Sequence, residues 1–93
     1  MKRVIKYEVW VECYKYNKHY KDYQIPFCFL YESNKYRDVK NYIDNINTIK
    51  DIRYLPTKDY DYVKLTIDKI WVDTQNDLKR EQKKYYKIID KEK

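Results

Sequence analysis

RVIKYEVWVECYKY, residues 3–16, has the clearest pattern in the chain and predicts the strand around which the fold is built. Apolar or aromatic residues occupy every second position, in the order Ile5, Tyr7, Val9, Val11 and Cys13. The alternate positions hold Lys6, Glu8, Trp10, Glu12 and Tyr14. A period of two is typical of a strand with one buried face, because successive side chains point to opposite sides of a sheet. We expect Ile5 to Cys13 to face the core.

A second strand is predicted over residues 23–31, joined to the first as a hairpin by a polar loop at about residues 17–22. The register that collects the apolar side chains on one face pairs Cys13 with Phe27, Val11 with Phe29 and Val9 with Tyr31. This register also places Trp10 opposite Leu30. Pro26 has no N–H to donate, so its strand should lie at an edge of the sheet, or its partner groups should face away at that point.

A helix is expected from about residue 35 to residue 49, with Ser33 or Asn34 as its cap. Its apolar residues recur at helical spacing, and its solvated face holds Arg37, Lys40, Asn41, Asp44 and Asn47. Residues 51–55 form a short strand candidate, and a longer strand should follow from Tyr60 or Tyr62 to Val72. The polar residue Lys69 interrupts its alternation, so the strand either bulges near Asp68 or is covered on both sides in its second half.

A last helix is predicted to begin at Thr74, Asn76 or Asp77, because five residues then form a narrow apolar stripe among basic ones. These residues are Leu78, Gln82, Tyr85, Ile88 and Ile89. The predicted order is therefore ββαββα. We expect a two-layer α+β fold in which a four-stranded, mainly antiparallel sheet carries both helices on one face.

Composition limits the classes of function. The chain has 93 residues, which fit a single domain over residues 1–93, and it has no glycine. Phosphate-binding loops and dinucleotide turns use glycine where the backbone must approach a ligand closely, so no nucleotide-binding motif of the usual form is present. No apolar run is long enough to span a membrane, and no signal sequence is recognisable. The net charge of the chain is +6. We expect a cytoplasmic protein.

Catalytic and metal-binding constellations are not recognisable in the sequence. The proposed register puts Cys13 and Cys28 on opposite faces of the sheet, which predicts two unpaired thiols. With one histidine and two separated cysteines, no standard zinc spacing occurs, and we expect neither a metal nor a cofactor. His19, Asp22 and Tyr23 would be the residues of an enzyme, but nothing in the sequence joins them. The nearby pair Asp59 and Asp61 is typical of a solvated strand end.

The outer face of the first hairpin is the predicted protein interface. Trp10 and Tyr14 lie there among acidic residues, and large aromatic side chains ringed by charge are typical of protein interfaces. The predicted interface residues are Glu8, Trp10, Glu12, Tyr14, Leu30 and Glu32. The alternative is that the last helix or the segment around Trp71 covers this patch and makes it a second small core.

Nucleic-acid binding is the alternative function, through the basic side chains of the predicted last helix. These residues are Lys79, Arg80, Lys83, Lys84 and Lys87. The acidic residues Glu8 and Glu12 would repel a phosphate backbone from the aromatic face, so protein binding is the leading hypothesis.

In size and composition, the whole chain resembles the small accessory proteins of phages and mobile elements, including anti-CRISPR inhibitors of host defence. The resemblance implies a non-enzymatic viral protein that occupies the surface of a host protein or ribonucleoprotein, with a homodimer as one arrangement. The acidic side chains Glu8, Glu12, Asp59 and Asp61 would then contact a basic nucleic-acid channel of the target.

Overall fold

The structure of the protein is a computed structural model, which describes residues 3–16, 22–53, 55, 60–73, 75 and 77–91. Only the backbone is described for residues 16, 22–27 and 83–85. The strands are β1 (Arg3–Tyr16), β2 (Asp22–Ser33), β3 (Tyr62–Val72) and β4 (Leu78–Asp90). The helix α1 (Tyr36–Asp44) and the short 3-10 helix η1 (Ile49–Asp51) lie between β2 and β3. None of the described helices is long and apolar enough to cross a membrane.

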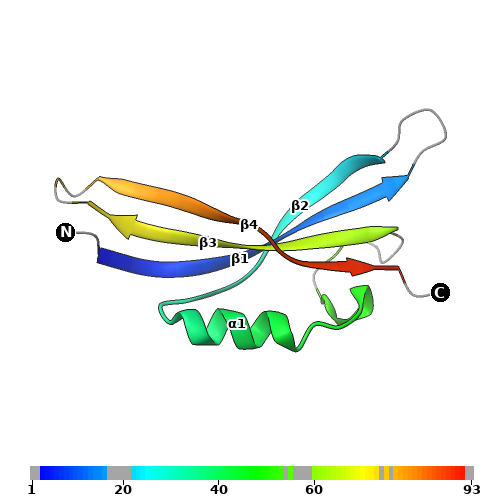
Figure 1. Cartoon of the computed structure of the whole chain (residues 1–93), viewed down its shortest axis with the longest axis horizontal. Coiled ribbons are helices and arrows are strands. Elements are labelled where there is room, and N and C mark those ends of the chain that lie inside the picture. Colours follow the sequence, from blue (N-terminus) through cyan, green and yellow to red (C-terminus); the bar gives the residue numbers. More distant parts are fainter. Residues whose placement is uncertain are drawn as a thin grey trace.

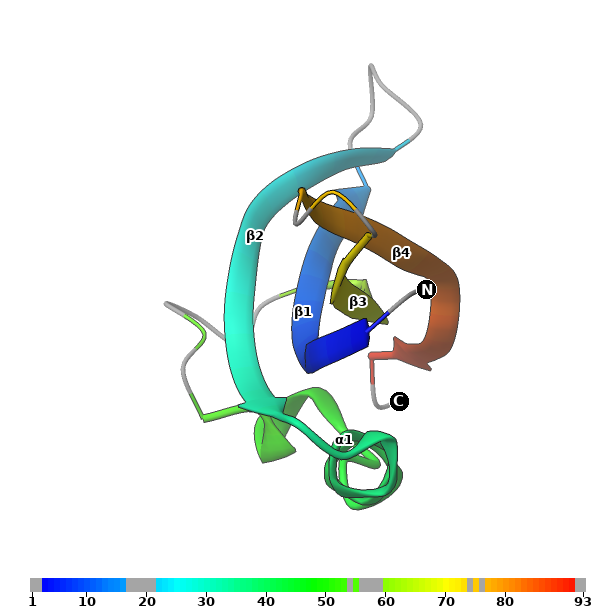
Figure 2. The same ribbon diagram turned by 90° about the vertical axis from the view of Figure 1, so that its left-hand side faces the viewer.

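The strands form one antiparallel sheet in the order β2-β1-β3-β4. The β1–β2 hairpin and the β3–β4 hairpin extend toward opposite ends of the elongated, strongly twisted sheet (Figure 1). Viewed along that long direction, α1 lies on one side of the sheet only (Figure 2). We call the face toward α1 the inner face and the opposite face the outer face. The predicted α+β class is confirmed, and β2 is an edge strand, as Pro26 predicts.

The predicted last helix is wrong, because residues 78–90 form strand β4, hydrogen-bonded along β3. Without β4, the far edge of β3 would leave backbone groups unpaired in a strand that is mostly buried. Pairing with β3 therefore outweighs the helical spacing of the apolar residues. The predicted ββαββα order and the predicted second helix are therefore wrong. The predicted strand at residues 51–55 is also wrong, since η1 ends at Asp51 and Ile52 lies in no strand.

Helix α1 begins at Tyr36, close to its predicted start, but ends earlier than predicted, and the predicted cap at Ser33 or Asn34 is wrong. Lys35 is the N-cap residue, and the Ser33 hydroxyl supports it by accepting a hydrogen bond from the Lys35 N–H (3.2 Å) and donating one to the Asp38 carboxylate (2.7 Å). Asp38 lies in the first turn, where a negative charge stabilises the helix dipole. The helix ends at Asp44 instead of residue 49. Its predicted solvated face is confirmed as exposed.

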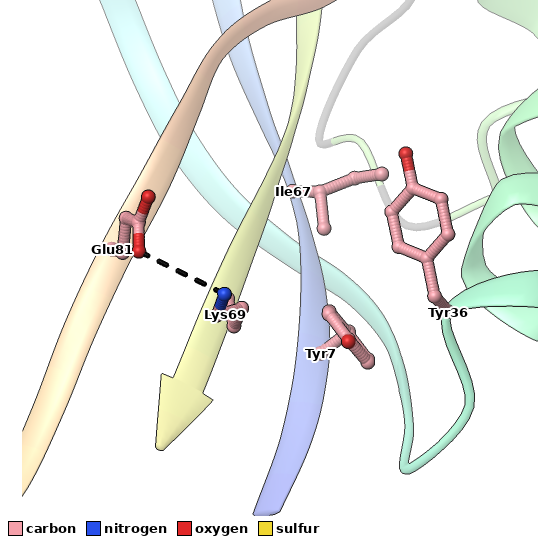
Figure 3. A pocket seen from close by; sticks show the side chains of 5 residues that line it. All are labelled: Tyr7, Tyr36, Ile67, Lys69 and Glu81. Carbon is pink, nitrogen blue, oxygen red and sulfur yellow. Dashed lines mark ion pairs between the residues drawn. The ribbon is translucent and has the colours of Figure 1, made fainter. Parts of the chain in front are cut away.

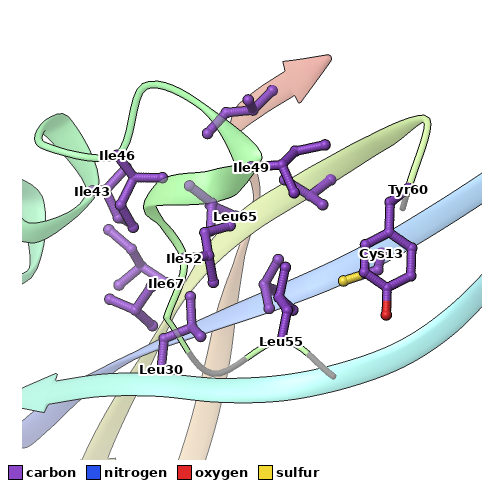
Figure 4. Close-up of a cluster of buried hydrophobic side chains, with 14 of the residues drawn as sticks. Cys13, Leu30, Ile43, Ile46, Ile49, Ile52, Leu55, Tyr60, Leu65 and Ile67 are labelled. Atoms are coloured by element: carbon purple, nitrogen blue, oxygen red, sulfur yellow. The ribbon is translucent and has the colours of Figure 1, made fainter. Parts of the chain in front are cut away.

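The core lies between the inner face and the segment from α1 to Tyr60 (Figure 4). Its most deeply buried apolar members are Val9, Val11, Cys13, Val39, Ile43, Ile52, Val63 and Leu65. Burying one such side chain contributes about 1.5–3 kcal/mol for the larger aliphatic residues. The predicted inner face of β1 is thus confirmed from Tyr7, which packs partly buried against the core, to Cys13. Ile5 is 41% exposed, because β1 is bulged between Val4 and Lys6 where it pairs with β3.

A bulge in β2 changes the predicted hairpin register. Val9 pairs with Tyr31 as expected, but Trp10 pairs with Phe29, so Leu30 is an extra residue in β2. An extra residue in one strand reverses the face on which the side chains beyond it lie, relative to a regular pairing. Leu30 is accordingly buried in the core, while Phe29 is 43% exposed. Beyond the bulge the predicted pairs are wrong: Cys28 pairs with Val11, and Phe27 with Glu12.

The same bulge brings the two cysteines to one side of the sheet. Cys13 is fully buried, and Cys28 packs partly buried against the same core cluster. Their predicted placement on opposite faces is therefore wrong, although both are free thiols, as expected. Burial, together with the neighbouring Cys28, raises the pKa of the Cys13 thiol to about 12. A thiol that stays protonated is a poor nucleophile, so Cys13 has the chemistry of a core residue.

The sequence of β3 left open whether the strand bulges near Asp68 or is covered on both sides. The strand runs unbroken from Tyr62 to Val72, and Leu65, Thr66, Ile67 and Asp68 are all buried. Both faces of its central part are therefore covered. The irregularity in this region affects pairing with β4, between Leu65 and Ile67.

Lys87 of β4 fastens the sheet to the C-terminal end of α1. Its Nζ donates hydrogen bonds to the carbonyl oxygens of Ile43 (3.2 Å) and Ile46 (2.6 Å). These bonds place a positive charge where the helix dipole is negative.

Lys87→Met should lower the free energy of unfolding by about 1–2 kcal/mol, because two charge-assisted hydrogen bonds are lost. Lys79→Met on the same strand is the matched control, since Lys79 is exposed, and should change stability by less than about 0.5 kcal/mol. Urea unfolding measures both. Equal effects of the two substitutions would show that Lys87 does not stabilise the helix end.

Candidate functional site: the outer face of the sheet

The outer face is built from alternate residues of the antiparallel strands. The register aligns Glu8 of β1 with Asp68 of β3, and Asp68 with Gln82 of β4. One step along, Lys6 aligns with Ile70, and Ile70 with Arg80. Helix α1 lies against the other face, so among the described residues no helix covers these side chains.

Five charged side chains form an ion-pair cluster on this face. The Arg80 guanidinium bonds to Glu8 (2.6 Å) and to Asp68 (2.5 Å), and so joins β4 to β1 and β3. Lys6 lies 3.2 Å from Glu8 and 2.8 Å from Glu32. The side chains of Glu8 and Asp68 are only 9% and 6% exposed, whereas Arg80 is 52% exposed. The cluster therefore has buried carboxylates beneath a cation that reaches solvent.

The environment of Glu8 stabilises its ionised form. Burial acts to raise the pKa of Glu8, but hydrogen bonds from Arg80, Trp10 and Lys6 outweigh it, so the pKa is lowered overall. Hydrogen bonds to Glu8 and Asp68 raise the pKa of Arg80, and those to Glu32 and Glu8 raise the pKa of Lys6. These pKa shifts keep Glu8, Arg80 and Lys6 charged at neutral pH.

An aromatic pair borders the ion-pair cluster. The rings of Trp10 and Phe29 meet edge to face, with centroids 5.5 Å apart and an interplanar angle of 70°. The indole N–H of Trp10 donates to Glu8 (3.2 Å), which fixes the orientation of the ring. Phe29 is 43% exposed and Trp10 is partly buried. Apolar aromatic surface therefore reaches solvent beside the charged groups.

A second aromatic group lies farther along the same face. Tyr14 and Tyr62 stack with nearly parallel rings, 4.8 Å between centroids, and the Lys64 ammonium lies 4.8 Å from the Tyr14 ring centroid. The Tyr14 hydroxyl donates to Glu12 (3.0 Å). These contacts hold Tyr14 in a defined position on the outer face.

The predicted interface residues are brought together with one exception. Glu8, Trp10, Glu12, Tyr14 and Glu32 belong to the outer face. Leu30 was placed there wrongly, because the β2 bulge turns it into the core. Phe29 takes its place and was missed, since strict alternation assigns it to the buried face. Glu8, which was predicted to contact a basic channel of the target, pairs with Lys6 and Arg80 within the protein.

The residues of the nucleic-acid alternative do not form a basic helix. Lys79 is exposed, but Arg80 is paired with two carboxylates and Lys87 contacts the end of α1. Lys83 and Lys84 lie in β4, and only their backbone is described. Two of the five residues predicted to contact nucleic acid, Arg80 and Lys87, thus already bond to other groups of the protein.

A pocket of about 320 Å³ opens on the inner face beside the start of α1 (Figure 3). It is lined by Tyr7, Tyr36, Ile67, Lys69 and Glu81. Tyr7 and Tyr36 meet edge to face at 5.4 Å, and Lys69 lies 4.0 Å from Glu81. The two charged groups neutralise each other, and the lining contains no histidine, cysteine or serine that could act as a nucleophile or base.

The other residues considered for chemistry are scattered or lie outside the described part of the chain. Within that part, no group of three or more histidine, cysteine or acidic residues is placed to hold a metal ion. His19 and Asp59 lie outside it, and the side chains of Asp22 and Tyr23 are not described. The backbone N–H of Asp61 donates to the carbonyl of Tyr14 in β1, and its carbonyl accepts from the N–H of Lys91, just after the end of β4.

Comparisons of the chain with protein-family models, curated proteins and solved structures gave no significant match.

Arg80→Met should lower the free energy of unfolding by about 2–4 kcal/mol, because it leaves Glu8 and Asp68 buried without their main counter-charge. Arg80→Lys should recover part of the loss, since a lysine keeps the charge but not the planar set of donors. Urea unfolding measures both, with Lys79→Met as the control for exposed charge on β4. Unchanged stability of Arg80→Met would contradict a structural role for the ion-pair cluster.

Glu8→Gln should weaken the pH dependence of stability. Because the folded-state pKa of Glu8 is lowered from 4.5, its stabilising contribution is present above that value and is lost as the pH falls through the folded pKa. The stability gap between wild type and variant should therefore be widest above the ordinary pKa of 4.5 and shrink as the pH falls below it, where Glu8 becomes protonated in the wild type. Urea unfolding across this range measures the gap, and a constant gap would contradict the assignment.

Proposed function

We propose that the protein is a small, non-enzymatic binding protein that occupies the surface of a host protein or ribonucleoprotein with its outer sheet face. The observation that carries this proposal is the aromatic pair of partly buried Trp10 and exposed Phe29 beside the ion-pair cluster. Large aromatic side chains are the usual energetic anchors of protein interfaces.

The charges next to the aromatic pair support this role. Glu8 and Asp68 are already desolvated and paired with Arg80, so a partner that covers them removes little further hydration. Lys6 and Glu32 are more exposed and lie at the border of the cluster. An apolar centre with a polar rim is the common anatomy of an interface.

The small size, absence of glycine and charge-rich composition support an origin in a phage or mobile element, as in the anti-CRISPR type of inhibitor. Such a protein acts by steric occupation, which requires no catalytic group. The host protein, or a protein–RNA assembly, is the partner in this proposal, and the site of action is the host cytoplasm.

The test is affinity capture from a lysate of the host cell, with and without nuclease. A specific protein should be retained after nuclease treatment, and its affinity should fall about thirtyfold or more in Trp10→Ala and in Phe29→Ala, as expected for anchors worth about 2 kcal/mol. Arg37→Ala, on the exposed side of α1, is the control and should bind normally.

Unfolding of each variant separates binding from folding. Phe29 is partly exposed, so Phe29→Ala should remain folded while binding is lost. Retention that disappears with nuclease, and is unaffected by the two aromatic substitutions, would replace the proposal with nucleic-acid binding. Recovery of the chain's own second copy alone would indicate a homodimer and would also contradict it.

A further inference from the structure

A shallow depression of about 420 Å³ lies on the outer face within the proposed interface. It is lined by Trp10 from β1, Asp68 from β3, and Arg80 and Gln82 from β4. The strand register fixes this set, because Asp68 lies between its partners Glu8 and Gln82 on the neighbouring strands. The floor of the depression is therefore rigid sheet, and its lining combines one aromatic wall with charged and amide groups.

One carboxylate oxygen of this lining lacks a hydrogen-bond donor. Asp68 Oδ2 bonds to Arg80, but Asp68 Oδ1 is buried and finds no partner among the residues that the structure describes. A buried carboxylate oxygen without a donor is unfavourable, and a donor entering the depression would remove that cost.

The depression can open toward Asp68 at Gln82. The side chain of Gln82 is exposed, and its amide reaches Thr66 Oγ1 only at 3.5 Å, the outer limit of a hydrogen bond. A partner group can displace this weak contact at little cost.

The local charge selects a cationic donor. The ion-pair cluster holds three carboxylates against two cations, so these five groups carry one net negative charge. This is the reverse of the whole chain, whose net charge is +6. A partner group with one positive charge would balance the cluster. A carboxylate can accept from two guanidinium groups, because its two oxygens offer about four lone-pair sites.

The aromatic wall favours a guanidinium over an ammonium. The Trp10 ring is held by its hydrogen bond to Glu8, so its orientation next to the depression is fixed. A guanidinium is planar and weakly hydrated, and it can stack on an indole while donating to a carboxylate at its edge. A lysine ammonium is a more strongly hydrated point charge with no plane to stack.

We propose that the depression between Trp10 and Asp68 binds the guanidinium of an arginine side chain presented by the partner protein. The arginine stacks on Trp10 and donates a hydrogen bond to Asp68 Oδ1. This inference rests on the proposed function and names the group that the outer face recognises.

The test is an NMR titration of the full chain with a short peptide that contains one arginine and is otherwise uncharged. The matched control has citrulline in place of arginine, which keeps the planar shape and some of the N–H donors but replaces one nitrogen with a carbonyl oxygen and removes the charge. The indole N–H signal of Trp10 is identified by its loss in Trp10→Phe. It should shift on addition of the arginine peptide, and the dissociation constant from this titration should be at least about tenfold lower than that for the citrulline peptide. Equal binding of the two peptides, or no shift with either, would overturn the proposal.

Gln82→Lys is the variant of choice, because Asp68 is buried and its own substitution would destabilise the sheet. A lysine at position 82 lies opposite Asp68 in the register and can supply the missing donor from within the chain. It should abolish the response to the arginine peptide in a protein that stays folded, while the neutral Gln82→Ala should keep it. An unchanged response in Gln82→Lys would place the arginine elsewhere.

The two proposals fail separately. If the peptides do not bind but Phe29→Ala still abolishes capture of the partner, only the arginine site is wrong. If the arginine peptide binds as expected but no protein is captured through Trp10 and Phe29, the function is wrong and the site remains.

Discussion

The bridge that Arg80 makes to Glu8 and Asp68 is the interaction on which the outer face depends. Two carboxylates that are more than nine-tenths buried need a counter-charge within the sheet, and the guanidinium supplies it from the neighbouring strand. Strand β4 presents Arg80 in this position, opposite Ile70 of β3. The polar requirement of the outer face and the backbone requirement of β3 therefore favour the same structure for residues 78–90.

Strand β4 also connects the two layers of the fold through its basic residues. Arg80 is directed to the outer face and neutralises carboxylates, while Lys87 is directed to the inner face and bonds to the end of α1. The basic residues of β4 thus stabilise the structure on both sides of the strand, by neutralising carboxylates on the outer face and by bonding to the end of α1 on the inner face. The irregular pairing between β3 and β4 lies between these two residues, where the strand adjusts its register.

Local patterns predicted part of this structure, and non-local contacts decided the rest. The buried side of β1 from Val9 to Cys13 and the exposed side of α1 follow from periodicity within each segment. The bulge at Leu30 does not, because alternation along β2 is equally regular with Leu30 on either face and only packing against the core chooses between them. For β4, the run Tyr85–Tyr86 followed by Ile88–Ile89 was a signal for a strand, since aromatic and β-branched residues favour sheets. The partnership of Arg80 with Glu8 joins residues far apart in the sequence and has no local signature.

The position of β1 in the strand order has a consequence for how the chain assembles. β1 is made before β2, yet its other neighbour, β3, follows only after β2, α1 and η1. The hairpin with β2 can close early, but the opposite edge of β1 stays open until β3 is made. Such non-local pairing slows folding, because a long chain segment must be ordered before its contacts form. The newly made chain therefore presents the unpaired edge of its central strand throughout that interval.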